Sequence, residues 1–117
     1  MAQQQREDRS SVATEDCGLE QQIREAVREV EPGARVILYG SRARGDARLD
    51  SDWDLLVLID GPVDYRRSEA VHRRLYTLEV MADQILTPIV SSEEEWGSPR
   101  VRATPFYANV TRDAVRL

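Results

Sequence analysis

Two segments of the chain carry apolar residues at the spacing of an amphipathic helix. In the first, which ends at Pro32 and Gly33, these residues are Leu19, Ile23, Ala26, Val27 and Val30. In the second, over residues 65–81, they are Ala70, Val71, Leu75 and Leu78. Recurrence every three to four positions places the side chains on one face of a helix. Asp16 is in position to cap the first helix.

Three short apolar runs predict strands. Residues 35–39 (RVILY) stop at Gly40, as a strand that feeds a turn does. Residues 53–60 (WDLLVLID) are apolar on both alternating faces after Asp54, which is typical of a central strand covered on each side. Residues 82–90 (ADQILTPIV) predict a third strand, and Pro88 places its latter half at a sheet edge or a bulge.

The end of the chain predicts two further helical segments. Residues 91–96 carry a serine ahead of acidic residues, which indicates a capped helix start. Residues 105–114 predict a terminal helix that packs Phe106, Val110 and Ala114 inward. The order helix, strand, turn, strand, helix, strand, helix predicts an α/β (α+β) domain with a mixed sheet flanked by helices. The short connection between the first two strands allows either a parallel or an antiparallel pair.

Length, composition and charge narrow the class of protein. A chain of 117 residues has room for one domain. Residues 1–16 are polar, so we expect a disordered tail there and a folded domain over residues 17–117. The net charge of −5 argues against a nucleic-acid backbone as the main ligand, and every basic residue is an arginine. A single cysteine, Cys17, excludes an internal disulfide framework, and with no signal peptide or membrane-spanning run we expect a cytoplasmic location.

Two aspartates at the head of the second predicted strand are the main candidates for chemistry. Asp52 and Asp54 are two positions apart, so both carboxylates project from one face while Trp53 points into the core. Their mutual repulsion is relieved by a divalent cation, and Mg²⁺ prefers oxygen ligands together with waters and substrate phosphates. A third acid on a neighbouring strand makes room for a second ion. Asp83 is the candidate for that acid.

The turn after the first predicted strand supplies groups suited to phosphate. Gly40 lets the backbone approach a ligand closely, and the hydroxyl of Ser41 adds a hydrogen-bond donor. Arg42 and Arg44 are close enough in sequence to neutralise an anion. Together with the aspartates, these residues predict a site for a metal-bound nucleoside triphosphate. Nucleotidyl transfer at such a site depends on positioning and charge stabilisation.

The string LYGSRARGDARLDSDWDLLVLID, with ten residues between Ser41 and Asp52, resembles the signature of the DNA polymerase beta-like nucleotidyltransferase superfamily. Within it, the chain is most similar to the minimal nucleotidyltransferase (MNT) group, and the resemblance extends over residues 19–117. It implies the mixed-sheet fold of that superfamily and a two-metal site for Mg²⁺ or Mn²⁺. Gly40 and Ser41 would hold the triphosphate, and Asp52, Asp54 and the third acid would ligate the metals. In several relatives the third acid lies closer to the Thr-Pro pair, where Ile85 stands in this chain.

The resemblance also implies a function. Members of the MNT group pair with a small helical HEPN ribonuclease, and the implied role is an antitoxin that transfers AMP from ATP to a tyrosine of that toxin, releasing pyrophosphate. Two alternatives stay open. One is a binding module with weak catalysis that neutralises its partner by contact. The other is a nucleotidyltransferase for a small, aminoglycoside-like molecule, completed by a homodimer.

Overall fold

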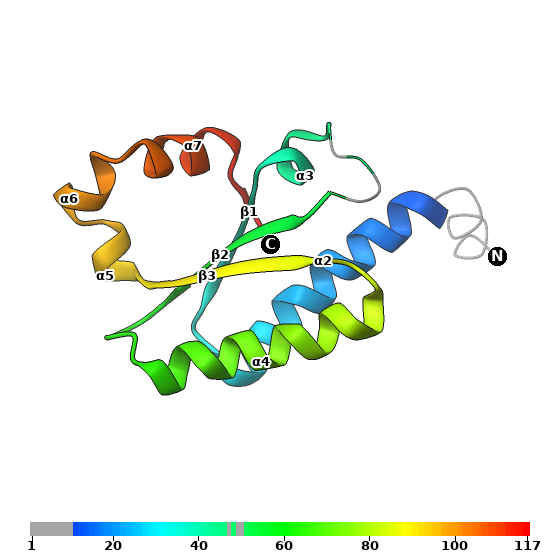
Figure 1. Ribbon diagram of the computed structural model, residues 1–117, viewed down its shortest axis with the longest axis horizontal. Coiled ribbons are helices and arrows are strands. Elements are labelled where there is room, and N and C mark those ends of the chain that lie inside the picture. The colour runs from blue at the N-terminus through cyan, green and yellow to red at the C-terminus, as the bar shows by residue number, and fades with distance from the viewer. Residues whose placement is uncertain (1–10, 47, 49–50) are drawn as a thin grey trace.

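A mixed sheet of four strands forms the centre of the protein (Figure 1). The structure is a computed structural model that describes residues 11–46, 48 and 51–117. The strands are β1 (Arg35–Tyr39), β2 (Trp53–Ile59), β3 (Leu86–Ser92) and β4 (Val115–Arg116), in the order β3-β2-β1-β4. β1 is antiparallel to β2 and β4, whereas β2 and β3 are parallel. The expected mixed sheet is confirmed, and the strands on either side of the Gly-Ser turn prove to be antiparallel.

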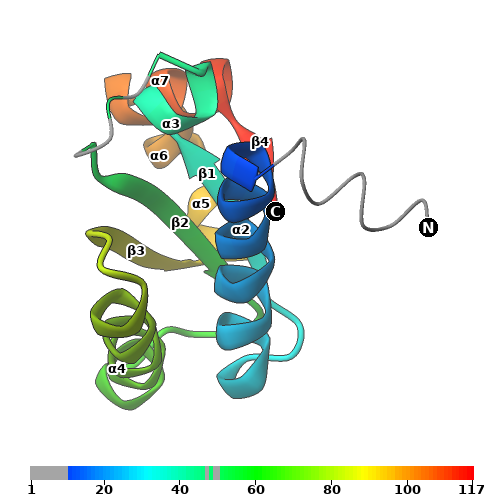
Figure 2. The same cartoon turned by 90° about the vertical axis from the view of Figure 1, so that its right-hand side faces the viewer.

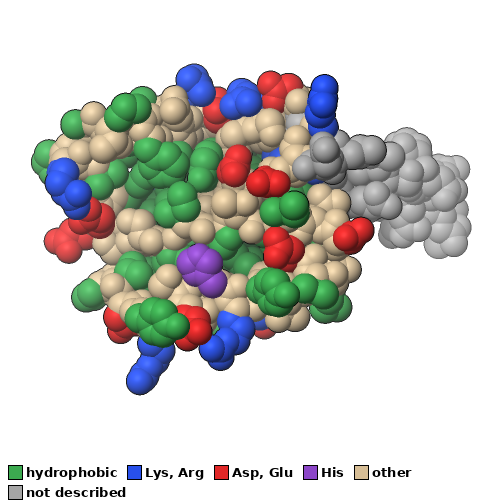
Figure 3. Space-filling view, in the orientation of Figure 1, with side chains coloured by type: hydrophobic (Ala, Val, Ile, Leu, Met, Phe, Trp, Pro, Cys, Tyr) green, Lys and Arg blue, Asp and Glu red, His purple; other side chains and the backbone are tan. Residues whose placement is uncertain are grey.

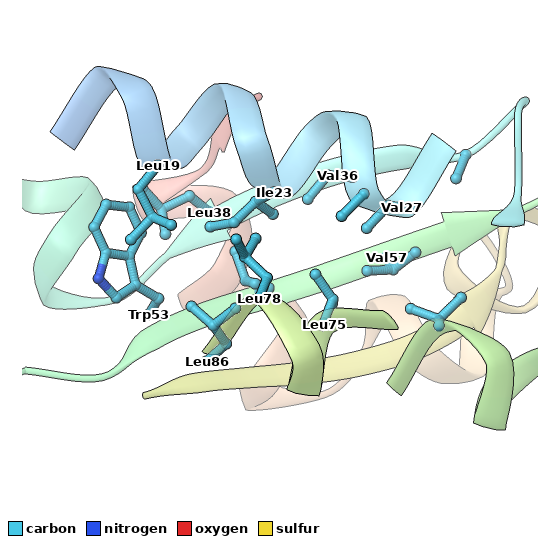
Figure 4. Packing of buried hydrophobic residues seen from close by; sticks show 14 of the residues in the cluster. Leu19, Ile23, Val27, Val36, Leu38, Trp53, Val57, Leu75, Leu78 and Leu86 are labelled. Carbon is cyan, nitrogen blue, oxygen red and sulfur yellow. The ribbon is translucent and has the colours of Figure 1, made fainter. Parts of the chain in front are cut away.

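The larger hydrophobic core lies between the sheet and two long helices, α2 (Ser11–Val30) and α4 (Tyr65–Ala82) (Figure 2). The two helices lie on the same face of the sheet and direct their apolar stripes toward it, as the helical spacing predicts. Figure 4 shows Val27 of α2 and Leu75 of α4 beside Val57 of β2 in this layer. Asp64 caps α4 by accepting a hydrogen bond from the Arg67 N–H at 2.8 Å.

Three short helices cover part of the opposite face of the sheet. They are α5 (Glu93–Trp96), α6 (Pro99–Arg102) and α7 (Pro105–Asp113). The smaller core beneath them consists of Ile37, Leu56, Leu58, Trp96 and Val110. Because β2 is buried on both faces, its apolar run is continuous, as expected for a central strand. The remaining helix, α3 (Ser41–Arg44), is a single turn at the end of β1.

Several boundaries differ from the sequence-based expectation. α2 begins at Ser11, so residues 11–16 belong to a helix and Asp16 is not its cap. The expected tail otherwise falls on residues 1–10, which lie outside the described residues. Of the three residues expected inward on the terminal helix, Val110 is fully buried, whereas Phe106 is 37% exposed and Ala114 is exposed. The expectation missed β4, because a two-residue strand is defined only by its pairing with β1.

The predicted strand over residues 82–90 is wrong in its first part. Ala82 is the last residue of α4, and Asp83 is the left-handed residue that ends the helix, with φ of 55°. The Asp83 N–H donates to the carbonyl of Glu79, which closes the last turn. The strand begins only at Leu86. Its place at the edge of the sheet confirms the reading of Pro88 as an edge-strand proline.

Candidate active site

The turn at the end of β1 brings the backbone of Gly40 against the side chain of Asp54. Gly40 has φ of 79° and ψ of −157°, a conformation open essentially to glycine alone. Tyr39 lies directly opposite Asp54 in the antiparallel pair. A Cβ atom added to Gly40 would stand 2.4 Å from Oδ2 of Asp54, closer than any non-bonded contact allows. The glycine therefore makes the space that the Asp54 carboxylate occupies.

α3 follows directly and begins at Ser41. Its one turn closes through hydrogen bonds from Arg44 N–H to Gly40 O and from Gly45 N–H to Ser41 O, both 3.0 Å. Gly45 ends it in the left-handed conformation, with φ of 83°. The first backbone N–H groups of a helix have no acceptor within that helix. Ser41 thus begins a turn that directly follows the glycine packed against the Asp54 carboxylate.

The two aspartates at the start of β2, Asp52 just before the strand and Asp54 within it, differ in environment. Trp53, between them, is 2% exposed and belongs to the larger core, which confirms the expected alternation along the strand. Asp52 is exposed and Asp54 is half-buried. Burial raises the pKa of the Asp54 carboxyl, the charge of Asp52 raises it further, and the charge of Arg44 opposes both. A cation placed between the two carboxylates would relieve this repulsion.

The carboxylates of Asp52 and Asp54 are suitable ligands for Mg²⁺. Two carboxylates, completed by waters and phosphate oxygens of a substrate, are a usual Mg²⁺ ligand set. Within the part of the chain that the structure describes, no group of three or more His, Cys, Asp or Glu side chains could hold a metal ion. The residues shown therefore suit an ion that shares its coordination sphere with a nucleotide.

Asp83 was expected at the start of a strand beside the aspartate pair, and this placement is wrong because Asp83 ends α4. The β3 residue aligned with Asp54 is Thr87, and Ile85 lies two positions before it with 56% of its surface exposed. The position next to Asp54 on the neighbouring strand is thus uncharged. A metal-binding role for Asp83 stays a prediction without support from its position.

Arg42 makes contacts within the protein. Its guanidinium donates to the carbonyl of Ser51 at 3.0 Å and to Oε1 of Gln84 at 3.3 Å, and it stacks 4.8 Å from the ring centre of Trp53. Gln84 Oε1 also accepts from Nε1 of Trp53 at 3.1 Å. These contacts join α3 to the residue that precedes Asp52. Gln84 was not among the predicted site residues. The spacing of residues along the chain does not indicate that its side chain accepts hydrogen bonds from both Arg42 and Trp53.

Arg44 joins the turn to the last helix. Its guanidinium donates to Oδ2 of Asp113 at 3.0 Å and to Oδ2 of Asp46 at 3.3 Å. Hydrogen bonds from Arg112 and Arg44 lower the pKa of the Asp113 carboxyl. The sequence gives no signal for Asp113 either, since 69 positions separate it from Arg44. The structure shows the guanidinium groups of Arg42 and Arg44 bound to acceptors within the protein. A phosphate-binding role for either arginine stays a prediction.

The geometry agrees with the comparison to known families. Residues 20–102 match the model of the family described as "Nucleotidyltransferase domain". The chain belongs to this nucleotidyltransferase family. The match covers β1, β2 and β3, and therefore both the Gly-Ser turn and the aspartate pair.

Solved structures share the fold of this nucleotidyltransferase. One, a crystal structure of a toxin-antitoxin with AMP-PNP, is 18% identical, with a TM-score of 0.57 over 83% of this chain and 70% of that chain. Another, of a mutant of the toxin-antitoxin MntA-HpeT, is 19% identical, with a TM-score of 0.56 over 84% and 70%. No curated protein matches by sequence. Within the described residues, no helix is both long and apolar enough to cross a membrane.

Proposed function

We propose that this nucleotidyltransferase transfers AMP from Mg-ATP to a hydroxyl of a partner protein, and that it acts as an antitoxin toward a HEPN toxin whose tyrosine is the acceptor. The observation that carries the proposal is the packing of the Asp54 carboxylate against Gly40. This contact joins the two halves of the site, a glycine turn suited to phosphate and a carboxylate pair suited to a metal.

In this proposal each residue has one task. Gly40 and Ser41 hold the β- and γ-phosphates through backbone N–H groups and the hydroxyl. Asp52 and Asp54 hold Mg²⁺, which when bound stabilises charge on the reacting phosphate. The acceptor oxygen bonds to the α-phosphorus, the bond from that phosphorus to the leaving pyrophosphate breaks, and the hydroxyl proton goes to solvent.

The nature of the partner and of the nucleotide rests on similarity. Two structures with this fold are toxin-antitoxin structures, and one of them holds AMP-PNP, an ATP analogue. At this low identity the similarity supports a shared fold. The partner and the nucleotide are therefore hypotheses for this chain.

The test is the intact mass of the HEPN partner after co-expression with this chain. We expect the wild type to add one or more AMP units to the partner, and Asp52→Asn to add none. Asp60→Asn is the matched control, because Asp60 is exposed just beyond the other end of β2, away from the Gly-Ser turn. An unmodified partner with the wild-type chain in Mg²⁺ and ATP contradicts the proposal.

A second candidate function is neutralisation by contact alone. It is favoured by one observation, the uncharged Thr87 on β3 and Ile85 just before that strand, beside the aspartate pair, where a third carboxylate would assist catalysis. A contact antitoxin predicts that Asp52→Asn still binds and inhibits the partner. The enzymatic antitoxin predicts that this variant fails to protect cells that express the toxin.

A further inference from the structure

The strand order gives the site two different sides. β2, with Asp54, lies between β1 and β3. Gly40 is on the β1 side of Asp54, and Thr87 is on its β3 side. In nucleotidyl transfer, the attacking oxygen and the leaving pyrophosphate lie roughly in line on opposite sides of the phosphorus. If the turn at Gly40 holds the phosphates that leave, the acceptor hydroxyl has to approach over β3.

The face of β3 that continues from the aspartates is apolar and exposed. Ile85 is 56% exposed, Ile89 is 40% exposed, and Thr87 between them is exposed. Ile89 lies beside Leu56 of β2, whose side chain is in the smaller core beneath the short helices. Ile89 is therefore on the face of the sheet that these helices cover in part, but it stays exposed. Hydrophobic side chains gather beside acidic ones on this side of the molecule in Figure 3. We call Ile85, which directly precedes β3, together with Thr87 and Ile89 the β3 strip.

The first part of the backbone edge of β3, at Leu86 and Pro88, is poorly suited to pairing with another strand. The Trp53 N–H donates to Ile85 O at 2.9 Å. In this parallel ladder the backbone N–H and C=O groups of the odd-numbered residues therefore point toward β2, and those of the even-numbered residues point away from the sheet. Of the outward positions, the Leu86 N–H donates to Oε2 of Glu79 at 2.8 Å, and Pro88 has no N–H. An acceptor therefore contacts the side chains of the β3 strip and does not pair as an added strand with this part of the edge.

We propose that the β3 strip is the acceptor subsite, and that it selects an uncharged hydroxyl side chain within an apolar segment of a protein. The inference rests on the proposed nucleotidyl transfer. A polycationic acceptor such as an aminoglycoside is held by carboxylates that offset the cost of desolvating its ammonium groups. The β3 strip offers two isoleucines and a threonine, which bind apolar and aromatic surface by burial.

The binding test uses three probes with Mg²⁺ and a non-hydrolysable ATP analogue present. They are a short peptide with tyrosine flanked by leucines, the same peptide with lysines, and an aminoglycoside. We expect the leucine peptide to shift the methyl NMR signals of Ile85 and Ile89 and to leave that of Ile23, buried on the far face, unchanged. Absence of the shift with this peptide, or an equal shift with either cationic probe, overturns the proposal.

Variants link the β3 strip to the affinity. Replacing Ile85 and Ile89 together by serine is expected to weaken binding of the leucine peptide by roughly tenfold or more, because each loses apolar surface that the acceptor buries. Affinity for the Mg-bound ATP analogue is expected to match the wild type. Met81→Ser is the matched control, since Met81 is 79% exposed and borders the groove between α2 and α4 instead. Equal losses in the double variant and the control overturn the proposal.

A transfer assay with labelled ATP separates this proposal from the proposed function. Methyl shifts and a weaker double variant without any transfer would show that the β3 strip binds the peptide and would contradict the enzymatic function, and with it the role of the strip as an acceptor subsite. Transfer to the leucine peptide that the double variant performs as well as the wild type would support the function and overturn the β3 strip.

Discussion

Substitution of Gly40 by alanine tests the contact on which the candidate site depends. Two costs follow from the structure. The backbone conformation of Gly40 is strained for any other residue, which costs about 1–3 kcal/mol in the free energy of unfolding. For a domain of this size, that loss lowers the melting temperature by roughly 4–12 °C. The added Cβ would also stand 2.4 Å from Oδ2 of Asp54, so the carboxylate or the turn has to move.

Displacement of Asp54 predicts a loss of metal-dependent binding beyond the loss of stability. Loss of a group that positions a metal-binding carboxylate typically lowers metal affinity about 10–100-fold. We expect a loss of this order for Gly40→Ala in calorimetric titration with Mg²⁺ and a non-hydrolysable ATP analogue, at a temperature where the variant is folded. Thermal unfolding of the same samples supplies the change in stability.

Gly45→Ala is the matched control. Gly45 also has a positive φ, of 83°, but no heavy atom lies within 4 Å of the position its Cβ would take. This variant carries backbone strain of about 1–2 kcal/mol without a contact to Asp54. We expect a comparable fall in melting temperature and a change in nucleotide affinity of only a few fold. Equal affinities for the two variants, or wild-type affinity in Gly40→Ala, would refute the reasoning.

Three further predictions concern stability. Gly18→Ala should raise the free energy of unfolding by about 0.5–1 kcal/mol in denaturant titration, because Gly18 lies in α2 with nothing within 4 Å of its Cβ position; a decrease would contradict this. Gln84→Leu should lower it by about 1–3 kcal/mol, because the Trp53 indole N–H loses its acceptor, whereas Gln84→Glu should retain most of the stability; equal losses would argue against this role. Glu93→Gln should be less stable than wild type near neutral pH, because the hydrogen bond from Arg35 holds the pKa of the Glu93 carboxyl below its usual value. A carboxyl with a lowered folded-state pKa stabilises the protein above its unfolded pKa, and this stabilisation is lost as pH falls through the folded value, so the gap in melting temperature should close in acid; a constant gap would contradict the prediction.

Local pattern predicted the parts of the fold that repeat along the chain. The spacing of Ile23 and Val27 placed the face of α2 correctly, and alternation around Trp53 placed the aspartates and the indole on opposite faces of β2. Both depend only on the geometry of a single helix or strand. The β3 start was mispredicted because Asp83 and Gln84 follow α4 without a glycine or proline, and a left-handed aspartate is a rarer way to end a helix.

The partners of the candidate site residues could not be predicted in the same way. Arg42 and Arg44 read as phosphate ligands because they follow Ser41, yet the structure gives them acceptors from Gln84 and Asp113. These acceptors are 42 and 69 positions away from the arginines they bind. Only the way in which the segments pack decides which distant acceptor a long, flexible side chain reaches.

The sequence by itself determined the order of most elements, the central position of β2 and the motif of Gly40, Ser41, Asp52 and Asp54, because local spacing and residue type encode these features. The tertiary structure alone decided that β1 and β2 run antiparallel, so that Gly40 meets Asp54, and that Thr87 lies on the other side of Asp54. Strand direction and register depend on the burial of both faces of the sheet at once. The direction and register of the strands are therefore properties of the whole packed chain, and no single segment determines them.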